Sequence, residues 1–184
     1  MIFPFYWMLK TSFLTDSQAL EMPPKLWFSF PLYFGNYKEV FELAATGRAI
    51  CNSLFIAVVS TAGVLFTSSL AAFAFAKLRF PGEKKLFGLI FATMLIPSQV
   101  TLIPLYVVFS KIGWVDTHLP LIVPQIMVNA YGVFLIRQFM VSVPDSYIEA
   151  AKLDGAGYLR IYAGIMLPLC KPALVTLGMV TFVG

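Results

Sequence analysis

The residues whose types and spacing could support a specific chemistry are concentrated in one polar stretch, residues 149–168, between two strongly apolar segments. Glu149 is followed by two alanines, and three further residues separate these from Gly155. Alanine and glycine project little beyond the backbone, so another protein's backbone can approach such a surface closely. The stretch therefore indicates a surface that binds another protein.

Local signals predict that this stretch forms a bent pair of short helices. Pro144 disfavours helix at Val143, and Ser146 with Glu149 forms the S-x-x-E pattern of a capping box. Gly155 can end the first helix because glycine adopts a left-handed conformation without steric cost. A second helix over residues 156–163 is expected to stop before the proline at 168.

The spacing of this stretch resembles the cytoplasmic loop of binding-protein-dependent ABC importer permeases. Seven fixed positions match: Glu149, Ala150, Ala151, Gly155, Ile165, Leu167 and Pro168. The resemblance implies that the loop docks into a cleft of an ATPase subunit, with Glu149 facing a polar or cationic partner and Gly155 making the turn. Asp154 is included among the docking residues. A simpler interpretation, in which Glu149 only caps a helix and Gly155 only ends one, is compatible with docking.

The resemblance also implies the partners of this chain, and the sequence itself lacks motifs for catalysis or nucleotide binding. The expected partners are a dimer of ABC ATPase subunits, a second permease subunit and an extracytoplasmic solute-binding protein, and only the ATPase would use ATP and Mg. The sequence contains no G-x-x-x-x-G-K-[ST] phosphate loop, and its one histidine, His118, gives no metal-binding pattern. We therefore expect no catalytic residue, no metal site, no bound cofactor and no enzyme activity.

The composition is typical of a membrane protein. Hydrophobic residues make up 59% of the chain and charged residues 12%, against roughly 25% charged residues in soluble domains. A lipid bilayer accounts for such an excess of apolar side chains. The net charge of +4 fits basic cytoplasmic loops, and no basic-aromatic stripe indicates nucleic acid.

Charge-free runs predict an all-α integral membrane fold, which the resemblance identifies as the transmembrane domain of a type I ABC importer. Complete spans are expected at residues 49–76, 86–110 and 117–136, and partial spans at 2–9 and 172–184. Pro97 and Pro104 should kink or break the second span. Because the resembling subunits have six spans, the permease domain, residues 1–184, is expected to be incomplete at both ends and unable to support uptake alone.

The distribution of basic residues orients these spans. Residues 77–85 carry four positive charges, which places this loop in the cytoplasm. Two spans later, residues 137–168 form a second cytoplasmic loop, the one expected to dock on the ATPase. Residues 11–47 form an extracytoplasmic loop with a short amphipathic helix near residues 37–45. The chain is thus expected to be a multi-pass protein of a bacterial-type inner membrane.

Uncharged polar residues beside the prolines are candidates for a substrate path: Gln99, Gln125, Asn129 and Tyr131. Proline-broken helices often line cavities in transporters, and amide and phenol groups suit a sugar or related solute. The same residues could instead hydrogen-bond neighbouring helices. Resemblance to the maltose and glycerol-3-phosphate permease type favours carbohydrate import. An ion-coupled carrier or channel with a chance motif remains the alternative, disfavoured because the predicted span cores lack ionisable residues.

Overall fold

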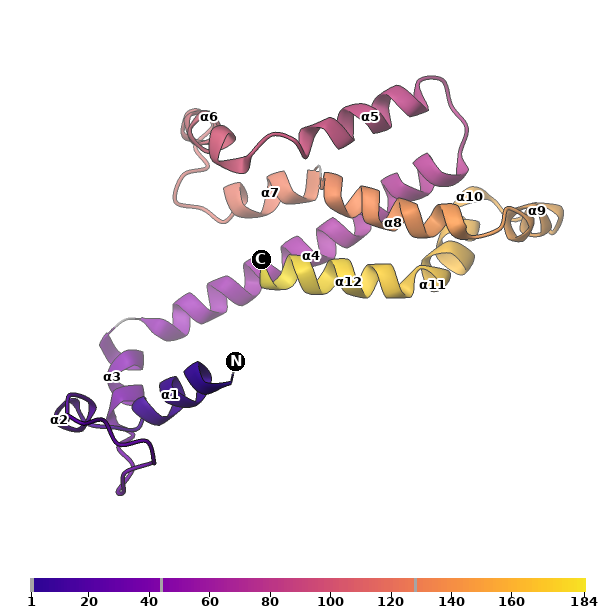
Figure 1. The fold of residues 1–184 in the computed structure, drawn as a ribbon. Helices are drawn as coiled ribbons and strands as arrows, with labels where there is room; N and C mark the ends of the chain where they lie inside the picture. Colours follow the sequence, from indigo (N-terminus) through magenta and orange to yellow (C-terminus); the bar gives the residue numbers. More distant parts are fainter. Residues whose placement is uncertain (1, 44, 128) are drawn as a thin grey trace. The chain divides into compact units, whose positions relative to one another are not determined.

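The structure is a computed structural model that describes residues 2–43, 45–127 and 129–184. The described residues form helices and connecting loops (Figure 1). They divide into two compact units, Met1–Ser53 and Leu54–Gly184. The predicted all-α fold is confirmed.

The first unit contains α1 (Phe3–Thr11), α2 (Asp16–Ala19) and α3 (Gly35–Leu43). The Asn36 side-chain amide donates hydrogen bonds to the carbonyls of Ser12 at 3.1 Å and Leu14 at 2.8 Å, which ties the start of α3 to the end of α1. Phe13 packs against the rings of Phe34 and Tyr37. The short helix predicted near residues 37–45 is therefore confirmed, and it begins two residues earlier than predicted.

Two helical segments are long and apolar enough to cross a membrane: α4 (Thr46–Lys77) and Leu119–Ser142, which comprises α7 (Leu119–Met127) and α8 (Ala130–Ser142). The span expected at 86–110 is instead a bent pair. Its two parts, α5 (Glu83–Thr93) and α6 (Ser98–Lys111), meet at 95°. The described residues thus hold two such spans, or up to four if each bent pair counts as one.

The break between α5 and α6 falls where proline was predicted to interrupt the helix. Pro97 is the N-cap residue of α6, with extended backbone, whereas Pro104 lies inside α6. A second bent pair, residues 158–169 followed by α12 (Lys171–Val183), has an angle of 78°. The apolar run predicted from residue 172 is thus confirmed as a helix, and its first turn contains Pro172, where a missing N–H is tolerated.

Helix α8 ends later in the chain than predicted. The helix continues to Ser142, six residues beyond the expected limit at 136, so Arg137 is helical and not part of a loop. The helical segment Leu119–Ser142 therefore carries an ionisable residue near its end, at a position that was predicted to lie in a loop. A charged residue does not have to end a helix, because the long arginine side chain can lie along apolar surface and place its charge elsewhere.

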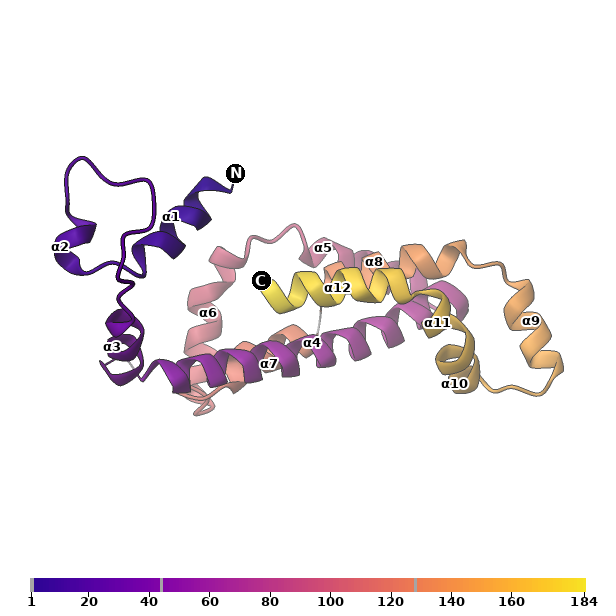
Figure 2. The same ribbon diagram turned by 90° about the horizontal axis from the view of Figure 1, so that it is seen from below.

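Helices α4, α8, α9 (Ser146–Leu153), α10 (Tyr158–Ile161) and α12 share one core in the second unit (Figures 1 and 2). Val64, Phe73, Met140, Met166 and Leu177 are buried at its centre. Ser68 and Ala72, on the small-residue face predicted for α4, are fully buried. Such residues let helix backbones approach closely in a membrane.

Candidate docking site

The first docking helix, α9, begins one residue earlier than the capping box predicts. Val143 has the extended conformation expected before Pro144. However, Asp145 is the N-cap residue, Ser146 is already helical, and no side chain caps the helix by a hydrogen bond. The predicted capping box is therefore wrong. Lys77 binds the Asp145 carboxylate, so this group does not turn back towards the helix amides.

The turn after α9 agrees with the prediction for Gly155. Its φ is +78°, a value that costs an L-amino acid with a side chain on the order of 1 kcal/mol or more. The amide of Gly155 donates to the Lys152 carbonyl at 3.0 Å, and the amide of Ala156 donates to the Ala151 carbonyl at 2.9 Å. These two bonds form a Schellman motif. Gly155 therefore ends α9 in the left-handed conformation.

The second docking helix begins two residues later than predicted and does not stop before Pro168. It begins with α10, continues as a π-helical turn, Tyr162–Met166, and then as α11, Leu167–Leu169. Proline cannot donate the i→i−4 hydrogen bond of an α-helix. The wider π turn directly before α11 changes the hydrogen-bond register at this position. The prediction of a helical stop is therefore wrong.

The helix pair α9–α10 has one face turned to solvent and one face packed in the chain's own core. The side chains of Leu153 and Leu159 are 89% and 76% exposed, and Glu149 and Ala150 are also exposed. On the other face, the buried residues are Ile148, Ala151, Ile161, Tyr162 and Met166. Ala151 thus allows close packing within this chain, whereas Ala150 remains accessible to a partner.

A groove of about 250 Å³ lies between α9 and the start of the second docking helix. Three candidate docking residues line it, Ala151, Asp154 and Ile165, together with Arg160 and Gly164. Of the other motif residues, Gly155 and Pro168 are exposed, and Leu167 is half-buried. The fold therefore gathers part of the motif around one concave surface and leaves the glycine turn accessible.

Two residues of α4, Lys77 and Ser69, make polar contacts with the region of the candidate docking helices. The Lys77 ammonium donates to the Val143 carbonyl at 2.7 Å and to Asp145 Oδ1 at 2.6 Å. Lys77 holds the pKa of the Asp145 carboxyl below its ordinary value of 3.8, first through this hydrogen bond and then through charge attraction. The second contact is buried, between Ser69 Oγ and the Tyr162 hydroxyl at 2.7 Å.

These four residues were missed as part of the site. From the sequence, Lys77 is one of the four positive charges that orient the spans. Its partner Asp145 is 68 positions away, and Ser69 and Tyr162 are 93 positions apart. A lysine at the end of a long apolar run needs acceptors if it is buried, but no local pattern identifies which acceptors it finds.

The candidate substrate-path residues have different environments. Gln99 is exposed in the first turn of α6, and Gln125 and Tyr131 are exposed on α7 and α8. Asn129 instead caps α8, because its side-chain oxygen accepts a hydrogen bond from the Gly132 amide at 2.7 Å. The cavities described for this chain are lined by other residues. Asn129 thus has a structural partner, whereas Gln99 and Gln125 present their amides at the surface.

Comparison with known proteins gives relatives along nearly the whole chain. A putative ABC transporter permease protein, ORF2, from Caldicellulosiruptor is 39% identical over 178 residues, which cover 95% of this chain and 63% of that protein. The sn-glycerol-3-phosphate transport system permease protein UgpE of Yersinia enterocolitica is 33% identical over 189 residues, covering 100% of this chain and 66% of the relative. The chain thus spans just under two thirds of the length of these relatives.

The fold also matches a solved structure, a bacterial ABC transporter involved in the import of the acidic polysaccharide alginate. The TM-score is 0.88 at 23% identity, over 99% of this chain and 64% of the other. A family model described as "Binding-protein-dependent transport system inner membrane component" matches residues 63–184, which is more than half of the chain. This chain therefore belongs to the family of binding-protein-dependent transport system inner membrane components.

Proposed function

We propose that this chain is a permease subunit of an ATP-driven importer, in which it forms part of the path for a sugar or related solute. In this proposal it couples to a separate ATPase subunit through α9 and α10. The named substrates of the relatives, sn-glycerol-3-phosphate and alginate, support this solute class. The motif from Glu149 to Pro168 supports the docking role.

The observation that carries the proposal is the two-sided packing of the docking helices. One face, with Glu149, Leu153 and Leu159, is exposed, and the other contributes Ile148 and Ile161 to the core shared with α4, α8 and α12. Because protein cores are closely packed, a force on the exposed face moves the helices that share its core. An ATPase bound to this surface can therefore act on the membrane helices mechanically.

The proposed assembly includes a dimer of ATPase subunits, a second permease subunit and an extracytoplasmic solute-binding protein. ATP and Mg are used by the ATPase, and the chain itself has no phosphate-binding loop in its sequence. The loop at residues 77–85 and the docking helices lie on the cytoplasmic side in this arrangement. The purified chain, free of other subunits, should not hydrolyse ATP.

The placement of Arg137 inside α8 bears on the alternative of an ion-coupled carrier. Such carriers move protons through groups that titrate, mostly carboxylates and histidines, whereas arginine stays protonated in proteins. The Arg137 Nε donates to the Phe75 carbonyl at 3.1 Å, and its guanidinium lies over the Phe87 ring at 4.3 Å. Neither long span, Thr46–Lys77 or Leu119–Ser142, contains Asp or Glu. These observations favour an external energy source.

The experiment compares Gly155→Val with Gly157→Val in the full-length permease assembled with its partners. An added Cβ meets nothing within 4 Å at either glycine, but Gly155 has a φ of +78° and Gly157 a φ of −74°. Only the first substitution should therefore distort the turn after α9. We measure ATPase subunit retained on purification and substrate-stimulated ATP hydrolysis.

Gly155→Val should reduce both quantities by roughly fivefold or more, which corresponds to about 1 kcal/mol of backbone strain, while membrane insertion is unchanged. Gly157→Val should resemble the parent. If Gly155→Val retains the ATPase and couples hydrolysis to transport as the parent does, the turn after α9 is only a helix stop and the docking proposal fails.

A further inference from the structure

A polar cavity of about 690 Å³ lies where α4 ends and where the last turns of α8 meet α9. Five basic residues line it: Lys77, Arg79, Lys84, Arg137 and Lys152. Three acidic residues also line it: Glu83, Asp145 and Glu149. Because the long apolar helices end at this level, the cavity lies at the edge of the membrane in the proposed arrangement.

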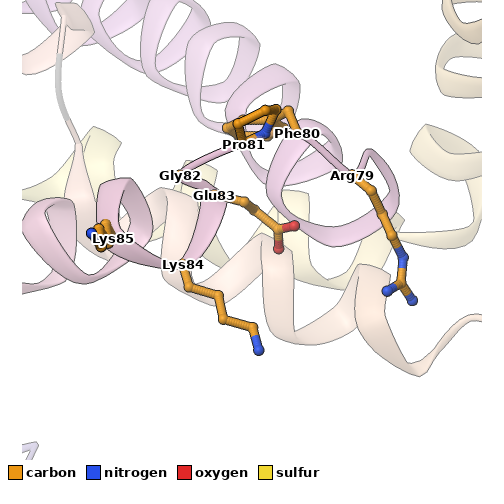
Figure 3. A pocket seen from close by; sticks show the side chains of 7 residues that line it. All are labelled: Arg79, Phe80, Pro81, Gly82, Glu83, Lys84 and Lys85. Atoms are coloured by element: carbon orange, nitrogen blue, oxygen red, sulfur yellow. The ribbon is translucent and has the colours of Figure 1, made fainter.

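The charges of this cavity are not balanced within the chain. Lys77 and Asp145 neutralise each other through their 2.6 Å contact, which leaves four cations and two carboxylates. A second cavity, of about 640 Å³ and lined by residues 79–85, shares Arg79, Glu83 and Lys84 with the first. Figure 3 shows these three side chains extending from the same side of the loop. The surplus of positive charge favours an anionic ligand.

Arg137 is held in place by contacts within the chain. It is half-buried, and its contacts with the Phe75 carbonyl and the Phe87 ring use Nε and one face of the guanidinium. The hydrogen bond described for this side chain uses Nε and not the terminal nitrogens, and Arg137 lines the cavity. A guanidinium held in this way can donate two parallel hydrogen bonds to phosphate oxygens.

The surface next to the cationic residues is apolar. The apolar side chains of Phe75, Leu78, Val141 and Ile148 also line the cavity, and Val141 is 49% exposed. A free phosphate ion would not cover these side chains, whereas the acyl chains of a lipid would. Basic pockets between membrane helices on the cytoplasmic side are suited to anionic headgroups.

We propose that this cavity binds an anionic phospholipid, with its phosphate on Arg137 and Lys84 and its acyl chains along Val141. Because Lys152 and Glu149 belong both to the cavity wall and to α9, the bound lipid borders the docking element. The site depends on the charges of the cavity and its position at the membrane edge. It does not depend on coupling to the ATPase, so a lipid-retention assay tests it separately from the proposed function.

The experiment uses the full-length permease with its partner subunits in nanodiscs containing equal parts of phosphatidylglycerol and phosphatidylcholine. After extraction into neutral detergent, native mass spectrometry gives the ratio of the two lipids retained. The parent should retain phosphatidylglycerol preferentially. Arg137→Gln and Lys84→Gln should each lower this ratio roughly fivefold, as expected for one basic residue at a membrane surface. Lys171→Gln is the matched control, because Lys171 is an exposed lysine outside the cavity at the start of α12.

Lys84 is exposed, so its substitution tests the site even if Arg137→Gln fails to fold. An unchanged ratio in Lys84→Gln, or an equal fall in Lys171→Gln, would overturn the proposal. In nanodiscs of phosphatidylcholine alone, inorganic phosphate should not raise the melting temperature; a rise that Lys84→Gln abolishes would identify a free anion instead. If Lys84→Gln lowers ATPase retention without changing the lipid ratio, the cavity belongs to an acidic protein segment, and the lipid assignment is wrong.

Discussion

Lys77 at the end of α4 holds Asp145 at the start of α9, with 2.6 Å between Nζ and Oδ1 across 68 positions of the chain. The lysine side chain is 4% exposed and the aspartate side chain 72% exposed. The same ammonium donates to the Val143 carbonyl. The turn that leads into α9 is therefore fixed to the end of α4 by a buried cation.

Replacing Lys77 by methionine should loosen this turn. The Val143 carbonyl loses its recorded donor, and an acceptor left without a partner costs about 1–3 kcal/mol. We expect the full-length permease to insert and to retain less stimulation of ATP hydrolysis by substrate. Lys77→Arg, which keeps the charge and the donors, should restore part of the stimulation. If methionine and arginine give the same activity as the parent, Lys77 does not position the docking element.

Acidification should weaken the ion pair between Lys77 and Asp145. Because Lys77 holds the folded-state pKa of Asp145 below 3.8, the contact stabilises the folded state above that pH and is lost as the pH falls through the lowered pKa. The purified permease should melt at a higher temperature than Asp145→Asn at neutral pH, and this difference should disappear in acid. A difference that persists in strong acid, or that titrates near neutral pH, would contradict the ion pair as its source.

The buried contact between Ser69 and Tyr162 predicts unequal effects of its two deletions. In Tyr162→Phe, the Ser69 hydroxyl still donates to the Leu65 carbonyl at 2.6 Å, so the cost should be about 1 kcal/mol or less. In Ser69→Ala, the buried Tyr162 hydroxyl loses its recorded partner, and the cost should be about 1–3 kcal/mol. Thermal unfolding of the two variants and of the double variant measures the asymmetry. A larger effect of Tyr162→Phe would contradict this account, because it would mean that the Leu65 carbonyl does not compensate Ser69 for the lost hydroxyl.

Alanine substitutions should separate the candidate substrate-path residues into two groups. Gln99→Ala and Gln125→Ala, at exposed positions, should change substrate selectivity or transport while assembly of the complex stays normal. Asn129→Ala removes the cap of α8, so it should lower stability by about 1 kcal/mol. Transport and thermal unfolding are measured on the same preparations. If both glutamine variants transport as the parent does, these residues do not line the path.

The sequence alone determined the fold class, the position of α4, the break at Pro97 and the left-handed turn at Gly155. Each depends on a local property: the length of an apolar run, the missing N–H of proline, or the freedom of glycine at positive φ. The match of the Glu149 to Pro168 motif likewise required only spacing. These features could be predicted because neighbouring residues specify them.

The end of α8, the start of α9 and the partners of the buried polar groups were decided by the tertiary structure. Arg137 could remain helical because Phe75 and Phe87, from other helices, receive its side chain. Asp145 became the N-cap residue of α9 while its carboxylate binds Lys77. Ala151 was turned into the core and Ala150 away from it. Such outcomes depend on contacts between residues far apart in the chain, and the free energies of those contacts are not encoded in any local pattern.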